Sequence, residues 1–581
     1  MDYMYKKDFL ARTYLQDKYG NNSLLLYALQ LRFEIPDIIS VAGDALTDGG
    51  NDKKCDLIYV DRDAGVAVIA QGYMKQNDVK GALAPSNKAS DLNTAAAWVF
   101  SQDPVNVPEQ IREQVLVLQD SIKDDSISSI YFWFVHNLNE QNNPEIKKEL
   151  KTMQTAAQGL LEKFFPSNEI KVEAVEVGNE TIEKWYNATS KRITVIDSMY
   201  VETPGVGFEL NGDKWKAYVT AVSAKWLQQK YNTYKDDILS GNPRTYLGSG
   251  KKKNKINLGI IATINQQPGN FWAYNNGVTA LVNDYRIEEG PKERLHISGM
   301  TIINGAQTTG ALSGVTDLKD AWVPIRFIVC DNSNIIDDII SNNNKQNEIL
   351  PSDLRSNDKI QNSLRAEFMK WDKYYYSGGR RGNIRPYRSK EVLDPYVVAQ
   401  ALLAFHGDCV TAYNSKNKLW ESDRLYNSIF SENLTAEHII FTYALSRSID
   451  LYKRELQQKG DDRIDIEEEQ HKYFLKRGSK MLLLFTISKC IEGILNKKIR
   501  DNWALEFKNS DDFNKLVNCW MTVISAILPL AVSDLGEVLE DGLKNKELSE
   551  KKAHKVAGTF ASVKKVSKLE LTEFANAVTI K

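Results

Sequence analysis

The spacing of apolar residues predicts an N-terminal domain in which helices and strands alternate. Residues 24–33 (LLLYALQLRF) follow a helix-capping pair, Asn22-Ser23, and have the pattern of a buried helix. Two apolar runs, residues 57–60 and 66–70, flank a turn and predict a β-hairpin. Farther along, the pattern predicts helices over residues 89–101, 108–123 and 144–165, and strands over 129–135 and 170–177. An α/β domain over residues 1–190 is therefore expected.

The register of the predicted hairpin decides which polar residues meet at its open end. Pairing Asp61 with Val66 across the turn places Asp56 opposite Gln71. A register that differs by one residue would place Asp56 opposite Ala70 instead. We expect the first register, so an acidic side chain and a carboxamide should lie together where the two strands end.

Beyond residue 190 the pattern changes twice. Residues 192–222 are rich in strand-forming residues, residues 224–238 have helical spacing, and strands are expected again around residues 278–282 and 301–303. After residue 395 the chain has the spacing of long helices, over 397–405, 436–457, 464–496 and 511–534. The predicted fold class is therefore α/β (α+β) multidomain, with a central mixed α/β domain over 191–400 and a helical C-terminal domain over 401–581.

Two Asn-Gly pairs, Asn276-Gly277 and Asn304-Gly305, interrupt the central strands. Asn and Gly tolerate positive φ, so each pair predicts a turn. The second pair runs into a small-residue segment that can begin a helix, and such a turn aims free backbone N–H groups at an anion. An ordinary hairpin and an ordinary strand-to-helix turn are the alternatives. The surrounding side chains are polar but uncharged: Asn275, Asn276, Asn304, Gln307, Thr308 and Thr309.

Composition narrows the class of protein further. The chain has 581 residues, 42% hydrophobic and 26% charged, which is typical of a globular protein of several domains. The net charge of −2 means that any contact with nucleic acid must use local basic patches. Five dispersed cysteines without a CxxC pair argue for a reducing compartment. The N-terminal segment has no signal-like apolar stretch, and no apolar run is expected to approach the length of a membrane-spanning helix, so a cytoplasmic protein that does not contact a membrane is expected.

Four ordered motifs carry a family resemblance. NNGVTAL (275–281) and INGAQTTGAL (303–312) resemble the core of the AIPR family, the abortive-infection phage-resistance proteins. DDILSGNPRTYLG (236–248) and SNNNKQNEILPSDLRSND (341–358) are similar to segments that the family has upstream and downstream of that core. The resemblance implies a role in phage defence more directly than it implies a reaction.

The predicted hairpin also resembles the PD-(D/E)XK nuclease core. In that fold an Asp and a Glu or Gln on neighbouring strands hold a divalent cation, and a Lys two residues later assists the attacking water. The resemblance implies a restriction-endonuclease-like domain with Asp56, Gln71 and Asp44 as ligands of Mg²⁺, which prefers oxygen ligands. Tyr73 stands where the Lys is expected, so either Lys75 substitutes for it or the fold persists without cleavage. Asp48 and Asp52 would complete the acidic shell, and Glu34 would be the upstream helical acid.

Several segments are candidates for binding phosphate or nucleic acid. Arg244 has a planar fork that suits phosphate, with a surface salt bridge as the alternative, and Lys251, Lys252, Lys253 and Lys255 follow it. Residues 374–391 place arginines among tyrosines, which suits stacked bases, although a solvated loop has the same composition. The candidate binding residues are Arg244, Asn276, Gly277, Asn304, Gly305, Gln307, Thr308, Arg380, Arg381 and Arg385.

The order of elements after the second Asn-Gly pair is similar to that of ParB and DGQHR-type domains. In those proteins the region handles a nucleotide or a phosphate, but here Gln307, Thr308 and Thr309 replace the charged residue of their motif. Asn342, Asn343 and the amides after them indicate a helix end or a hydrogen-bonded loop, or else a plain polar connector.

Two functions remain open from the sequence. The first is an antiphage defence protein with a Mg²⁺-dependent endonuclease domain, whose catalytic residues would be Asp56, Gln71 and Lys75, and a core that senses nucleic acid or a nucleotide. The alternative is a non-catalytic binding or phage-sensing module with a degenerate nuclease domain. A nucleotide-hydrolysing switch is a third option, although the chain has no Walker loop. The expected partners are nucleic acid, DNA rather than RNA, then a nucleotide, a second copy of the chain, and a phage or defence-system protein.

Overall fold

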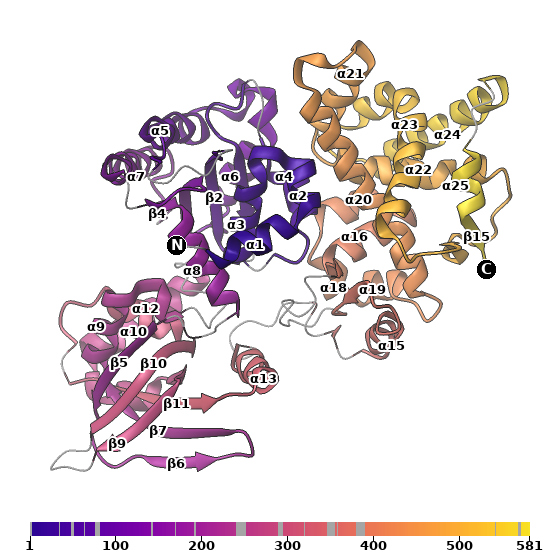
Figure 1. Ribbon diagram of the computed structural model, residues 1–581. Helices are drawn as coiled ribbons and strands as arrows, with labels where there is room; N and C mark the ends of the chain where they lie inside the picture. The colour runs from indigo at the N-terminus through magenta and orange to yellow at the C-terminus, as the bar shows by residue number, and fades with distance from the viewer. Residues whose placement is uncertain are drawn as a thin grey trace. The chain divides into compact units, whose positions relative to one another are not determined.

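The fold is described from a computed structural model of the chain (Figure 1). The residues it describes are 3–581 without 34, 48–50, 63, 76–81, 141–142, 169, 191–192, 194, 240–250, 289–293, 319, 345–351, 353–354, 357, 379–389, 541 and 568–570. The chain forms two compact units. Unit 1 comprises Met1–Ile35, Lys53–Asn106 and Val115–Glu348, and unit 2 comprises Pro36–Asp52, Val107–Gln114 and Ile349–Lys581. The fold is a mixed α/β architecture with a helical C-terminal region, as the sequence predicts.

Unit 1 begins with a sheet whose order, in the described residues, is β1-β2-β3-β4. Its strands are β1 (Leu57–Asp61), β2 (Val66–Tyr73), β3 (Ser129–His136) and β4 (Lys171–Val177). β1 and β2 form the predicted antiparallel hairpin, and Asp61 pairs with Val66. β2, β3 and β4 run parallel, so each connection needs a crossover. Helices α5 (Ser86–Ser101) and α6 (Glu109–Lys123) therefore precede β3, and α7 (Pro144–Phe164) precedes β4.

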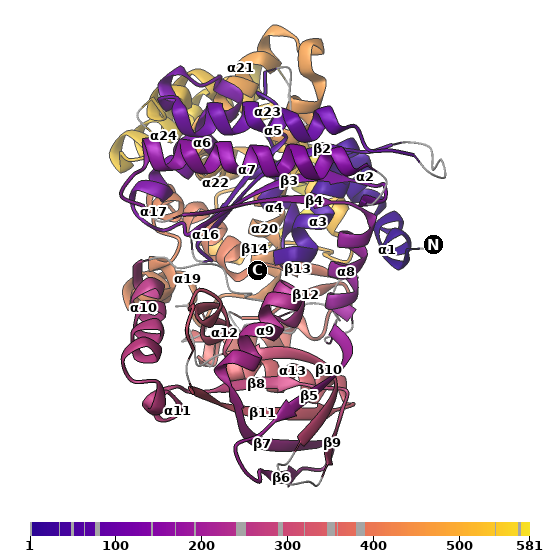
Figure 2. The same cartoon turned by 90° about the vertical axis from the view of Figure 1, so that its left-hand side faces the viewer.

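Helices cover both faces of this sheet and bury β3, whose central residues 130–135 are all apolar, along its whole length. All eight residues of β3 are buried, which is typical of a central parallel strand. Its Trp133 ring contacts Phe33 of α3 (Ser23–Phe33) and Trp185 of α8 (Asn179–Ser190), whereas Phe132 contacts Phe100 of α5. Consecutive strand residues point to opposite faces, so α3 and α8 lie on one face and α5 on the other. Figure 2 shows α5 and α7 side by side along the sheet.

The rest of unit 1 is a larger sheet, seven-stranded in the described residues, with the order β5-β10-β8-β11-β7-β6 and β9 paired to β10. The strands are β5 (Val195–Glu202), β6 (Phe208–Asn211), β7 (Trp215–Ser223), β8 (Val278–Leu281), β9 (Asp284–Glu288), β10 (Arg294–Asn304) and β11 (Trp322–Cys330). β8 and β11 are parallel and the other pairs are antiparallel. The main core includes apolar residues of α9 (Ala224–Tyr234) and α12 (Ala306–Ser313). A second cluster joins α13 (Ser333–Asn344) to β8 and β11 through Ile340, Leu281 and Ile328.

Unit 2 is built around long helices with one apolar core. These are α16 (Pro395–Phe405), α20 (Ala436–Lys459), α22 (Ser479–Leu495), α23 (Phe513–Val538) and α24 (Lys546–Ser567). The prediction of one helix over residues 464–496 is wrong. Gly478 has a φ of +84° and separates α21 (Asp465–Phe474) from α22, because a left-handed residue ends the preceding turn and leads into the next helix.

The expectation that no apolar segment approaches membrane-spanning length is also wrong. Within the described residues α23 alone is long and apolar enough, because residues 516–533 contain no charged side chain. Its Leu516, Trp520, Ile524 and Ile527 are buried in the core of unit 2. By length and composition a core helix passes the same test, and 44% of this apolar stretch is buried inside the protein.

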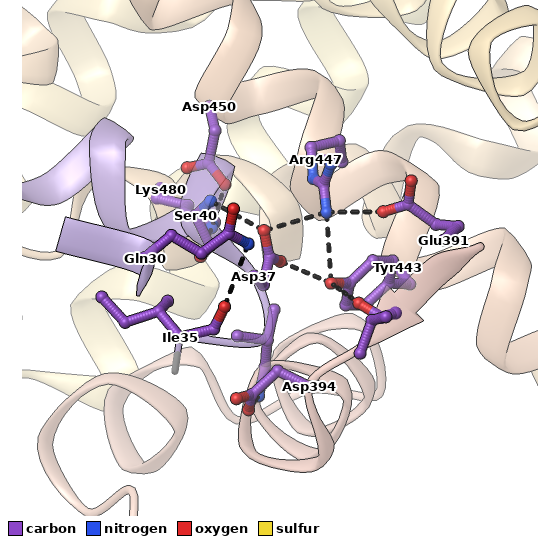
Figure 3. Close-up of polar contacts among 12 residues, drawn as sticks. Gln30, Ile35, Asp37, Ser40, Glu391, Asp394, Tyr443, Arg447, Asp450 and Lys480 are labelled. Atoms are coloured by element: carbon purple, nitrogen blue, oxygen red, sulfur yellow. Dashed lines mark hydrogen bonds and ion pairs between the residues drawn. The ribbon is translucent and has the colours of Figure 1, made fainter. Parts of the chain in front are cut away.

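A short N-terminal segment belongs to unit 2 rather than to the sheet that surrounds it in sequence. This segment contains α4 (Ile38–Ala45), whose N-cap Asp37 accepts a hydrogen bond from the Ser40 N–H at 3.0 Å. Arg447 Nη2 donates to Asp37 Oδ1 at 2.9 Å and to Glu391 Oε1 at 2.7 Å, and the Tyr443 hydroxyl donates to Asp37 Oδ2 (Figure 3). Nearly all of this network is removed from solvent, so the paired charges hold α4 within unit 2.

A second buried ion pair lies beside the first. Lys480 Nζ donates to Asp450 Oδ2 at 2.6 Å and contacts the Ser40 hydroxyl at 3.4 Å (Figure 3). A Cβ on Gly43 would lie 3.1 Å from Asp450 Oδ1, so the backbone of α4 packs directly against α20 at this point. Charge pairing and close backbone packing therefore both hold α4 against α20.

Candidate functional site

The predicted meeting of Asp56 and Gln71 is confirmed. The Asp56 N–H donates to the Ala70 carbonyl at 2.9 Å and continues the register of the hairpin. Gln71 Nε2 donates to Asp56 Oδ2 at 2.8 Å, and the Gly72 N–H donates to the same oxygen at 2.7 Å. Both side chains are buried. The two polar groups meet because cross-strand partners project from the same face of a hairpin.

The amide oxygen of Gln71 is the unusual atom of this pair. Gln71 Oε1 is buried and has no hydrogen-bond partner among the described residues. Leaving a buried acceptor unpaired costs about 1–3 kcal/mol, so such an atom needs a reason. An oxygen of this kind beside a carboxylate can be satisfied by a cation or by a water molecule that a cation holds.

The remaining predicted residues of this site have different environments. β2 ends at Tyr73, and Lys75 lies beyond it, with its N–H bonded to Asn137 Oδ1 at 2.9 Å and its carbonyl to Asn137 Nδ2 at 2.8 Å. The backbone at Lys75 is therefore fixed to the segment that follows β3. Asp44 is an exposed residue of α4 in unit 2, so its role as a third ligand stays a prediction. Glu34 and Asp48 lie outside the described residues, and no three Asp, Glu, His or Cys side chains of the described chain gather as a metal-binding group.

The two Asn-Gly turns of the central sheet pack against one another. Gly277 has a φ of +83° and Gly305 a φ of +95°, which confirms the predicted left-handed turns. A Cβ on Gly277 would lie 2.7 Å from the Pro324 carbonyl oxygen, and one on Gly305 would lie 3.0 Å from the Gly277 carbonyl oxygen. Only glycine fits these positions, because both the backbone conformation and the available space exclude a side chain.

Polar side chains join the two turns. Asn275 Oδ1 accepts from the Gly277 N–H at 2.8 Å, and Asn275 Nδ2 donates to Thr308 Oγ1 at 3.2 Å. The Thr309 hydroxyl donates to the Gly305 carbonyl at 2.9 Å, so Thr308 and Thr309 both bond within the protein. Asn276 is exposed, whereas Asn304 and Gln307 are half-buried. The amide-rich composition of the motif thus serves partly to hold the turns together.

Arg326 is not among the residues predicted from sequence, and it connects two of the four motifs. Arg326 Nη2 donates to Thr279 Oγ1 at 2.7 Å and to Asn343 Oδ1 at 2.9 Å. Thr279 belongs to NNGVTAL, and Asn343 belongs to the asparagine-rich segment at the end of α13. The available signal was that Arg326 is the only charged residue of the apolar strand WVPIRFIVC.

The tyrosines at the start of the arginine-rich segment have a structural role, contrary to the expectation that they stack on bases. Tyr374 and Tyr376 form β12 (Tyr374–Tyr376) and are buried in the core of unit 2. The Tyr374 hydroxyl donates to the Ser510 carbonyl at 2.5 Å, and the Tyr376 hydroxyl to Gln361 Oε1 at 2.9 Å. The candidate residues that lie outside the described chain are Arg244, Arg380, Arg381 and Arg385.

Comparison with known proteins agrees with the four motifs. The sequence model of the AIPR protein family matches residues 239–531, more than half of the chain, from the segment before α10 (Lys251–Gln266) into α23. Neither curated proteins nor solved structures include a significant match. The match covers the two Asn-Gly turns, Arg326 and the greater part of the helical core, but not the first sheet. The chain therefore belongs to the AIPR family, and this membership supports a role in abortive infection, as a defence against phage.

Proposed function

We propose that this AIPR protein is an antiphage effector whose N-terminal domain cleaves nucleic acid with the help of a divalent cation. One observation carries the proposal: the Asp56 carboxylate and the Gln71 carboxamide touch at 2.8 Å at the open end of the hairpin, and Gln71 Oε1 is buried without a partner among the described residues. In the PD-(D/E)XK fold, a carboxylate and an amide or second carboxylate oxygen on neighbouring strands are ligands of the cation.

The side-chain oxygens of Asp56 and Gln71 fit Mg²⁺ as ligands. The cation prefers hard oxygen ligands, and it commonly keeps several waters while taking only one or two protein groups. Asp56 and Gln71 would hold it, and when bound it would activate a water molecule and stabilise charge on the phosphate. Asp56 is held by its backbone bond to Ala70 and by the Gly72 N–H, so its carboxylate is fixed before any ligand arrives. Lys75 is the candidate to assist the attacking water, since Tyr73 has no cationic group.

The central sheet is proposed to sense nucleic acid or a nucleotide. Its two packed Asn-Gly turns place Asn276, Asn304 and Gln307 beside the start of α12. Amides and backbone N–H groups in this arrangement suit a phosphate oxygen. Because no disulfide joins any of the five cysteines, all of which lie in the described part of the chain, we also propose a reducing, cytoplasmic location.

A cleavage assay tests the catalytic proposal. Plasmid DNA, single-stranded DNA and RNA are incubated with the full chain in Mg²⁺, Mn²⁺ or EDTA, beside the isosteric variant Asp56→Asn. Cutting that requires metal and is lost in Asp56→Asn is expected. Asp61→Asn is the matched control, because Asp61 is the acid at the turn of the same hairpin. Within the described residues its carboxylate bonds to the Ala64 N–H and the Tyr59 hydroxyl, which both lie close to it in sequence. Cutting by Asp56→Asn at the wild-type rate would reject the assignment.

A second candidate is a binding module without catalysis. Asp56 Oδ2 already accepts two protein hydrogen bonds, and Tyr73 occupies the usual lysine position, so the hairpin is stable as a structural element. This alternative predicts no cleavage under any metal condition, together with a rise in melting temperature when a nucleotide or oligonucleotide binds. Absence of any such shift would count against it.

A further inference from the structure

We propose that Arg326 is the phosphate-binding residue of the central sheet, and that its ligand is a phosphate group of a nucleotide or a nucleic acid. The inference rests on the sensing role proposed above and assigns the charged contact that the Asn-Gly motifs lack. Four observations support it: the place of Arg326 in the sheet, its exposure, the bonds that hold its guanidinium, and the absence of a carboxylate partner among the described residues.

Arg326 lies at the end of the sheet where the Asn-Gly turns are. In the register of the strands it pairs with Thr279 of β8 on one side and with Val219 of β7 on the other. Thr279 in turn pairs with Asn304 of β10. Thr279 comes two residues after Gly277, so Arg326 is one strand away from the first turn and two strands away from the second. The residue is exposed, whereas its strand neighbours Ile325 and Phe327 are buried.

Neutral groups hold the guanidinium in place. Nη2 donates to Thr279 Oγ1 at 2.7 Å and to Asn343 Oδ1 at 2.9 Å, and the Thr279 hydroxyl also contacts Asn343 Oδ1 at 3.3 Å. Asn343 is itself anchored, because its Nδ2 donates to the Ile339 carbonyl at 2.8 Å. A side chain held by partners on two other elements, β8 and α13, loses little conformational entropy when a ligand binds, and this preorganisation favours affinity.

The positive charge of Arg326 has no acidic partner in the described part of the chain. Its neighbours along and across the sheet, Pro324, Ile328, Thr279 and Val219, are neutral. Other cations of the same sheet do have carboxylate partners: Lys216 Nζ is 2.9 Å from Asp284 Oδ1, and Arg294 Nη2 is 3.8 Å from Glu202 Oε1. An arginine positioned by neutral acceptors keeps its full charge for an anion, and its remaining N–H groups suit two oxygens of a phosphate.

Binding measurements with the full chain test the inference. The probes are inorganic phosphate, ATP, and a fluorescent single-stranded oligonucleotide, measured by calorimetry and fluorescence anisotropy. Arg326→Gln should weaken binding of the phosphate-bearing probe by ~10- to 100-fold, since a charge-assisted hydrogen bond is lost. Arg326→Lys should restore only part of the affinity, because an ammonium group cannot form the bidentate contact. Comparison among the three probes shows whether the phosphate belongs to a nucleotide or to a polymer.

Arg294→Gln is the matched control. Arg294 is an exposed arginine of the same sheet that has an acidic partner, so its loss should leave the affinity unchanged. Thr279→Val removes one of the bonds that hold the guanidinium and retains the shape of the residue, so it should weaken binding several-fold even if Arg326→Gln proves poorly folded. Equal affinity of wild type and a folded Arg326→Gln would overturn the inference, as would failure of the wild type to bind any probe. Neither result concerns Asp56, so failure here and failure of the cleavage proposal are distinguishable.

Discussion

Replacing Arg447 by Met should destabilise unit 2 by about 3 kcal/mol, because it removes the cation that pairs with both Asp37 and Glu391. Arg447 and Asp37 are almost completely removed from solvent, with 6% and 3% of their side-chain surface exposed. Removing one partner of a buried ion pair typically costs about 3–5 kcal/mol. Two features place the expected cost for Arg447→Met at the lower end of this range. Glu391 is only half-buried, and burial already raises the pKa of its carboxyl, so it can take up a proton.

The second feature is that Asp37 retains other donors. The Tyr443 hydroxyl and the Ser40 N–H still bond to its carboxylate when Arg447 is replaced. Removing the charge of Asp37 as well should therefore recover part of the loss. The double variant Asp37→Asn with Arg447→Met is expected to be more stable than Arg447→Met alone by at least about 1 kcal/mol, since no unpaired buried charge remains between them.

Hydrogen exchange at increasing urea concentration is the suitable assay. It measures the opening of α4 and α20 separately from unit 1, which a single melting curve of a chain with two units cannot do. Arg463→Met is the control, because Arg463 pairs with a partly exposed Glu468 at 2.7 Å in the same unit and should contribute below about 1 kcal/mol. A cost below about 1 kcal/mol for Arg447→Met would refute the view that this network holds α4 in place.

Two further predictions concern pH and backbone conformation. Burial raises the pKa of Asp450 to about 7, against the opposing effect of Lys480. In the unfolded chain the pKa of this carboxyl is about 4. The stability that the protonated carboxyl contributes is therefore fully present below about pH 4 and is lost as the pH rises through about 7. The melting temperature of wild type should therefore fall from pH 5 to pH 8 more steeply than that of Asp450→Asn, and equal slopes would contradict the assignment. Replacing Gly277 or Gly305 by Ala should cost about 1–3 kcal/mol in urea unfolding of unit 1, because each has positive φ and a new Cβ would lie within 2.8 Å of a neighbouring atom. Gly314→Ala, at a φ of −87° with no atom nearer than 3.9 Å, should change the stability by less than about 0.5 kcal/mol, and a comparable loss at all three positions would point to another cause.

Local patterns in the sequence were sufficient to predict most elements of unit 1. The apolar runs at 57–60 and 66–70 and the turn between them are a short-range signal, and they placed Asp56 beside Gln71 with the observed register. The Asn-Gly pairs were equally informative, because positive φ is a property of one residue and needs no distant contact. The helix boundary at Gly478 does not stand out in the sequence, because residues compatible with a helix continue on both sides of it.

The family motifs were visible in the sequence, but the way they meet was not. In the sequence, Asn343 is one of several neighbouring amides, and Arg326 is a single charged residue within an apolar strand. Their hydrogen bond at 2.9 Å depends on α13 packing across β8 and β11, which no local spacing reports. In the same way, the tyrosines at 374 and 376 looked suitable for stacking on bases, yet burial in unit 2 gives them a structural role.

The sequence by itself determined the class of the fold, the hairpin with its two polar side chains, the left-handed turns, and membership of the AIPR family. Each of these depends on residues that are neighbours in the chain or on motifs of fixed spacing. The tertiary structure alone decided that α4 belongs to unit 2, where Asp37 meets Arg447 across 410 positions of sequence. It also decided that Arg326, which has no acidic partner among the residues that the structure describes, lies beside the Asn-Gly turns. The physical reason is that desolvation and charge pairing depend on which surfaces come together, and those surfaces exist only after the chain has folded.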